Sequence, residues 1–82
     1  MSATQFKPGD RVRYVPGHAY DDIRHHDCED GAISSVSDLN TCFVKFDKAV
    51  ARFGWDGTIA QGCYPFDLVK ISIDTPAIRP KP

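Results

Sequence analysis

Short apolar segments, each ended by a turn signal, are the feature that most limits the folds open to this chain. Charged and apolar side chains alternate over residues 11–15, which places Val12 and Tyr14 on one face of a half-buried strand. Pro8-Gly9 precedes this segment and Pro16-Gly17 ends it. Further strands are predicted over residues 32–37, 41–46, 58–63 and 69–71. With five short strands and no long helix, the chain is predicted to be all-β.

The segment 41–46 gives the clearest strand pattern. Its alternation directs Cys42, Val44 and Phe46 to the core, and Phe43 and Lys45 to the other face. Residues 65–68 predict a 3₁₀ turn before the final strand. Five twisted strands of this length can close into a small barrel, which removes exposed sheet edges and buries one face.

The length of 82 residues allows one small domain, and a hydrophobic fraction of 41% is sufficient for a compact core. We expect a flexible N-terminus over 1–5, the barrel over 6–72 and a flexible, disordered Pro-rich tail over 73–82. The chain has no apolar run of about 18 residues and no apolar signal core near its start, which predicts a cytoplasmic protein outside the membrane.

Two motifs resemble the SH3-like small barrels, including the KOW and Tudor-like groups. The first is FKPGDRVRY at the entry to the first strand, and the second is PFDLVKI near the end. The resemblance runs from Phe6 to about Ser72. It implies a five-stranded SH3-like barrel in which a 3₁₀ turn leads into a last strand paired with the first. The chain also resembles short accessory proteins encoded by phages and prophages, some of which bind and inhibit host defence machinery.

A long loop between the first and second strands, residues 18–31, departs from the usual pattern of these barrels. The loop holds all three histidines, and its five acidic residues and one arginine give it a net charge of −4. The rest of the chain has nine basic and six acidic residues, a net charge of +3. The near-neutral total argues against binding nucleic acid by bulk attraction, but the charge is segregated.

The leading functional hypothesis is a non-enzymatic module that binds a host or phage protein, for example as a counter-defence inhibitor. The acidic loop 18–31 and an aromatic loop over 47–57 would contact the partner, and the module would be a monomer or a small homo-oligomer. The predicted partner-binding residues are Asp21, Asp22, Asp27, Glu29, Asp30, Phe53 and Trp55. Alternatively, Phe53 and Trp55 cap one end of the barrel.

The competing hypothesis is a nucleic-acid-binding domain, in which basic side chains contact phosphates and exposed aromatic rings stack on bases. The residues for this role are Arg11, Arg13, Phe43, Lys45 and Arg52. The same basic residues would also suit an ordinary solvated face.

A zinc-stabilised structural subunit is the third hypothesis. Zinc prefers imidazole nitrogen and thiolate sulfur, and the predicted ligands are His18, Asp22, His26 and Cys28. The spacing matches no standard zinc motif, and a solvated loop whose histidines pair with nearby acids explains the same residues. No other cofactor is expected.

Cys28, Cys42 and Cys63 are too few and too irregularly spaced for a disulfide framework, so we expect free thiols. A nucleophilic Cys28 with His26 or His18 as its base would make the chain an enzyme. Because a five-stranded barrel offers little concave volume, we predict that the chain is not an enzyme.

Overall fold

A single antiparallel sheet of five strands forms the protein in a computed structural model that describes residues 6–37, 41–47 and 60–80. The strands are β1 (Arg11–Tyr14), β2 (Glu29–Val36), β3 (Cys42–Phe46), β4 (Gln61–Cys63) and β5 (Leu68–Lys70). The described residues also contain two 3₁₀ helices between strands, η1 (Gly17–Ala19) and η3 (Pro65–Asp67), and no α-helix. The all-β class and the 3₁₀ turn before the last strand are therefore confirmed.

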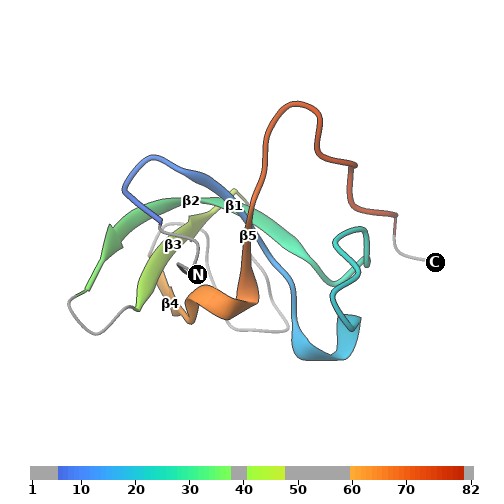
Figure 1. Ribbon diagram of the computed structural model, residues 1–82, viewed down its shortest axis with the longest axis horizontal. Helices are drawn as coiled ribbons and strands as arrows, with labels where there is room; N and C mark the ends of the chain where they lie inside the picture. The colour runs from blue at the N-terminus through green and yellow to red at the C-terminus, as the bar shows by residue number, and fades with distance from the viewer. Residues whose placement is uncertain (1–5, 38–40, 48–59, 81–82) are drawn as a thin grey trace, which may run out of the picture.

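The sheet is strongly curled, and its strand order of β4-β3-β2-β1-β5 explains why (Figure 1). The two edge strands, β4 and β5, are consecutive in the chain and joined through η3. In a flat sheet, four interstrand spacings would place these edges about 19 Å apart. Because η3 rises only about 2 Å per residue, the connection is too short for that distance, and the sheet must curl.

The described strands form a half-barrel, which is compatible with the small β-barrel predicted from the sequence. β5 pairs with β1 through Arg13↔Val69 and its neighbours, which confirms the expected pairing of the last strand with the first. β4 pairs with β3 only, so within the described residues both β4 and β5 leave one edge unpaired. Each of these edge strands is three residues long, which limits the exposed hydrogen-bonding edge.

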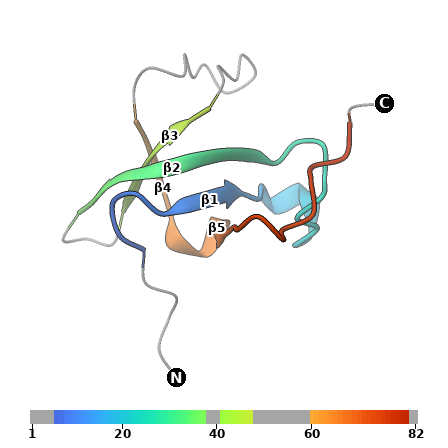
Figure 2. The same ribbon diagram turned by 90° about the horizontal axis from the view of Figure 1, so that it is seen from above.

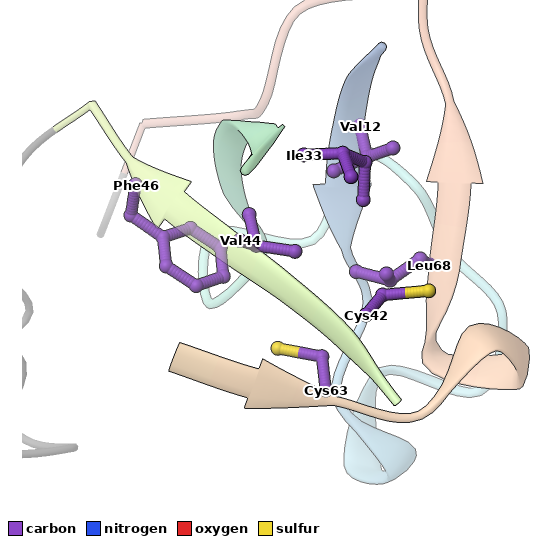
Figure 3. Packing of buried hydrophobic residues seen from close by; sticks show 7 residues of the cluster. All are labelled: Val12, Ile33, Cys42, Val44, Phe46, Cys63 and Leu68. Atoms are coloured by element: carbon purple, nitrogen blue, oxygen red, sulfur yellow. The ribbon is translucent and has the colours of Figure 1, made fainter. Parts of the chain in front are cut away.

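The main core lies on the concave face of the sheet, where side chains from all five strands meet (Figure 3). Its members are Val12, Ile33, Cys42, Val44, Phe46, Cys63 and Leu68. The predicted inward alternation of Cys42, Val44 and Phe46 is confirmed. Tyr14 packs at the edge of this core with its ring edge-on to Phe46, at 6.4 Å between ring centroids.

β2 begins at Glu29, inside the segment predicted to be loop, because its first residues pair with β1. The pairing sets Arg13 opposite Asp30, so the charged residues that favoured a loop are accommodated as a cross-strand pair. Further along, the register between β2 and β3 shifts between Ile33 and Ser35. Such a bulge bends a strand and strengthens its twist, which contributes to the curl.

Arg13 is buried in the convex side of the sheet, only 3% exposed. Its guanidinium donates to both carboxylate oxygens of Asp30 at 2.7 and 3.2 Å. The Nη1 atom donates to the carbonyl oxygens of Ile23, at 2.8 Å, and Pro76, at 2.6 Å. One side chain of β1 thus holds β2, the 18–31 loop and the C-terminal tail together.

The C-terminal tail leaves β5, arches away from the sheet and returns to the 18–31 loop (Figures 1 and 2). Ile78 packs against a second apolar cluster formed by Val15, Ala19, Cys28 and Ile23. The Arg79 amide donates to the Arg24 carbonyl at 2.8 Å. The tail was predicted to be flexible and disordered; its described part, up to Pro80, makes contacts through Pro76, Ile78 and Arg79.

We predict that replacing Arg13 is far more destabilising than replacing Arg11, although both pair with an aspartate. Arg13→Ala leaves Asp30 and two carbonyls partly buried without their donor, and should lower the free energy of unfolding by about 3 kcal/mol. Arg11 pairs with Asp47 at the surface, with both side chains 47% exposed, and Arg11→Ala should change the free energy by about 0.5 kcal/mol or less. Urea denaturation measures both, and equal effects would contradict the structural role of Arg13.

Gly31 tests the close packing of β2 against β3. A Cβ atom at Gly31 would lie 2.6 Å from the Lys45 carbonyl oxygen and 2.9 Å from the Phe46 Cα, both in the backbone. Gly31→Ala should therefore lower the free energy of unfolding by about 2 kcal/mol. Gly17→Ala is the matched control because no atom lies within 4 Å of its Cβ position. A neutral Gly31→Ala would show that this pairing is looser than described.

Candidate functional site

The loop between β1 and β2 is folded into a compact series of turns. η1 is followed by Tyr20 and Asp21, whose φ angles of 50° and 62° lie in the left-handed region and reverse the chain. Backbone hydrogen bonds from Asp22 to Ala19, His25 to Asp22 and Cys28 to His25 then close successive turns.

A cluster of His18, His25 and Asp27 forms at the surface of this loop, and we call it the histidine cluster. One ligand atom from each of the three side chains lies within 4.8 Å of the others. His18 Nε2 is 2.6 Å from Asp27 Oδ2, and the His25 Nδ1 atom accepts a hydrogen bond from the Asp27 amide at 3.0 Å. His26 stacks on His25 at 4.4 Å between ring centroids, with its Nε2 3.8 Å from Asp27 Oδ1.

Of the metal ligands predicted from the sequence, only His18 belongs to this cluster. Asp22 pairs with Arg79, and the buried Cys28 thiol donates to the Asp22 carbonyl at 3.4 Å. His25 was not among the predicted ligands, and Asp27 was predicted only for partner binding. The left-handed turn at Tyr20 and Asp21, which the residue pattern did not predict, determines that His18, His25 and Asp27 lie close together.

Burial gives all three thiols the environment of structural cysteines. Burial raises the pKa of Cys28 and Cys42 above the ordinary thiol value, and raises that of Cys63 to about 12, with Asp67 and Cys42 adding to the shift. Nucleophilic cysteines have lowered pKa values and partial exposure. The environment of Cys28, which is 2% exposed, therefore argues against the nucleophile alternative.

The acidic residues of the loop are mostly engaged within the protein. Asp22 pairs with Arg79, Asp27 with His18, and Asp30 with Arg13. The Arg24 amide and the Arg79 guanidinium hold the pKa of Asp22 below its ordinary value. Asp21 is exposed and Glu29 is half-buried. Two of the five acidic residues predicted to bind a partner, Asp22 and Asp30, are thus paired with arginines of the protein itself.

The basic residues proposed for nucleic acid are similarly divided. Arg13 is buried against Asp30, which argues against its predicted contact with phosphate. Arg11 donates to both carboxylate oxygens of Asp47, at 2.8 and 2.6 Å, and Lys45 is exposed. Phe43 is half-buried, and its ring lies over Gly62 of the neighbouring strand β4.

Arg52, Phe53 and Trp55 lie outside the described residues, so their predicted roles stay predictions.

Two exposed aromatic rings on η3 form a surface that the sequence reasoning missed. Tyr64 and Phe66 are 62% and 82% exposed. They stack on each other at 5.2 Å between centroids, with an angle of 5° between the ring planes. The available signal was the Tyr-Pro-Phe sequence directly before the last strand.

A shallow pocket of about 100 Å³ lies beside this aromatic pair. Phe66, Asp67 and Val69 form one wall, and residues of the β1–β2 connection complete it: Val15, Pro16, Gly17 and Asp21. Burial raises the pKa of Asp67 above its ordinary value. We call Tyr64, Phe66, Val69 and this acid-lined pocket the aromatic surface.

A larger cleft of about 610 Å³ lies between the tail and the strands β1 and β2. The charged residues along it are paired in the structure, Arg13 with Asp30 and Arg79 with Asp22. Because Ile78 and Arg79 line the cleft and also attach the tail to the loop, the width of this cleft depends on the tail contacts.

Comparison with protein-family models, with curated proteins and with solved structures finds no match for this chain. No helix among the described residues is long and apolar enough to cross a membrane.

The buried thiols predict slow chemical labelling and a loss of stability at alkaline pH. Native Cys28 should react with a maleimide at least roughly 100-fold more slowly than in urea, because labelling requires opening of the structure. Burial raises the pKa of Cys63 from an ordinary value of 9.0 to about 12, so its stabilising contribution is complete below about pH 9 and is lost as the pH rises towards 12.

Mass spectrometry of labelled peptides gives the rates, and urea denaturation at about pH 8 and about pH 10 gives the stabilities. Cys63→Ala should reduce the difference between the two pH values. Labelling of native Cys28 at the rate of a free thiol would contradict the structural role assigned to it.

Proposed function

We propose that this chain is a non-enzymatic, SH3-like binding module that binds another protein through its aromatic surface. The fold supports the SH3-like assignment in two respects: the strand order β4-β3-β2-β1-β5, and a 3₁₀ helix leading into the strand that pairs with β1. The partner remains the host or phage protein expected from the sequence.

The stacked, exposed pair of Tyr64 and Phe66 is the observation that carries this proposal. Neither ring contributes to the buried clusters, and both are held next to a pocket by the short η3 helix. Aromatic side chains lose little conformational freedom on binding and bury a large area, so they dominate the energy of many protein interfaces. Tyr20, directly before the pocket residue Asp21 in the chain, is a further exposed aromatic residue, at 89%.

Charge at the pocket indicates what the partner carries. Asp21 is exposed, and the raised pKa of Asp67 reflects a carboxylate that has lost part of its hydration. A cation placed near Asp67 would restore favourable interactions for its ionised form. The aromatic surface therefore suits a protein segment that presents an apolar side chain next to a lysine or arginine.

The same acids disfavour the nucleic-acid alternative at this surface. Stacked aromatic rings are used to bind single-stranded nucleic acids, but in combination with a positively charged groove. Here Asp21 and Asp67 line the pocket, Arg13 is buried and Arg11 is paired with Asp47. Binding of single-stranded nucleic acid is accordingly measured alongside the binding of peptides.

We predict that peptides selected for binding from a random displayed library combine a basic and an apolar residue, and that Phe66→Ala weakens their binding at least about tenfold. Because Phe66 is 82% exposed, its removal should leave the fold intact. Ile73→Ala is the matched control, since Ile73 is 99% exposed and lies in the tail. Asp67→Asn should weaken the basic peptides selectively.

Fluorescence polarisation of the selected peptides measures these affinities, and oligo(dT) is titrated in parallel at low salt. Peptides that bind the wild type and Phe66→Ala equally would overturn the assignment of the surface. Salt-sensitive binding of oligo(dT) that is lost in Phe66→Ala would replace the protein-binding function by the nucleic-acid one.

A further inference from the structure

The histidine cluster combines three metal-ligating side chains with a geometry close to that of a metal site. Its ligand atoms lie within 4.8 Å of one another. In a tetrahedral zinc site, ligand atoms about 2.0–2.1 Å from the metal are separated by about 3.3 Å. The required contraction is therefore small enough for side-chain rotation, and the loop backbone can keep its path.

The loop holds these side chains near one another before any ligand binds. His18 is placed by η1, and His25 and Asp27 follow the left-handed turn. The hydrogen bonds that close the turns on either side of His25 involve backbone atoms only. Ala19 and Cys28, next to the first and last members of the cluster, are both buried in the second apolar cluster.

We propose that His18, His25 and Asp27 bind a divalent transition-metal ion, with Zn²⁺ as the expected ion. Two imidazoles and one carboxylate are a ligand set that zinc accepts, with water completing the tetrahedron. The His18 side chain is 57% exposed, so the open side of the cluster faces solvent. This site is separate from the aromatic surface, and its test does not depend on the proposed function.

Metal binding would replace interactions that exist in the structure. The ion takes the place of the hydrogen between His18 Nε2 and Asp27 Oδ2, which leaves His18 protonated on Nδ1. His25 Nδ1 accepts the Asp27 amide hydrogen. If Nδ1 binds the ion, its lone pair is occupied, and if Nε2 binds the ion, the neutral ring carries its hydrogen on Nδ1. Coordination through either nitrogen therefore breaks that hydrogen bond. The Asp27 amide is consequently a direct reporter of metal binding.

Cys28 has no place in this site. Its thiol is buried and donates to the Asp22 carbonyl at 3.4 Å. A thiolate ligand would have to leave the second apolar cluster and break the packing beneath the loop. The site therefore uses nitrogen and oxygen ligands, unlike the set with Cys28 predicted from the sequence.

Isothermal titration of the untagged protein with ZnCl₂ at neutral pH tests the proposal. We expect one Zn²⁺ per chain with micromolar affinity or better, and a loss of at least about tenfold in His18→Gln, His25→Gln and Asp27→Asn. The ¹H–¹⁵N resonance of the Asp27 amide should shift in the wild type on addition of Zn²⁺. Circular dichroism of each variant verifies that the loss does not come from unfolding.

Two controls separate this site from general attraction of cations. Asp74→Asn removes the same charge from the exposed part of the tail, and His26→Gln removes the neighbouring imidazole. Both should retain the wild-type affinity within about threefold. Absence of binding at millimolar Zn²⁺ would overturn the proposal. Equal losses in Asp74→Asn and Asp27→Asn, or in His26→Gln and His18→Gln, would overturn the assigned ligands.

Discussion

The buried guanidinium of Arg13 is the interaction on which the arrangement of the loop and tail depends. Removing a charge from water is expensive, and only a full set of partners makes it tolerable. Asp30, which lies in β2, neutralises the charge of Arg13. The carbonyl oxygens of Ile23, in the 18–31 loop, and Pro76, in the tail, accept hydrogen bonds from the same guanidinium. Each segment therefore stabilises the position of the others, because moving any one of them would leave a buried donor unpaired.

Short connections impose the other main constraint. A chain of this size cannot cover both faces of a flat sheet, and the link through η3 forces β4 and β5 towards each other. The curl encloses the core on the concave side, where Val12 and Val44 are fully buried. It also places η3 at the surface between the edge strands, and this is why the aromatic pair Tyr64 and Phe66 points to solvent instead of the core.

The sequence was informative where side-chain alternation and turn chemistry act locally. The inward positions of β3 and the 3₁₀ turn at Pro65 follow from such local rules. The sequence was uninformative where a partner far away in the chain changes whether a residue is buried or exposed. Arginine is ordinarily exposed, and Arg13 is buried only because Asp30 and the tail reach it. Likewise, the meeting of His18 with Asp27 depends on a left-handed turn at Tyr20, a conformation that this residue type rarely adopts.

Part of the segregated charge of the sequence is used for contacts within the folded protein. An acidic loop on a basic remainder suggests a charged face for a partner, but two cations of that remainder, Arg13 and Arg79, pair with Asp30 and Asp22 of the loop. Opposite charges far apart in the chain thus dock the loop and tail onto the sheet. Since these charges are used internally, the two surfaces for which we propose binding are built from groups that folding leaves exposed, the aromatic rings beside the pocket and the side chains of the histidine cluster.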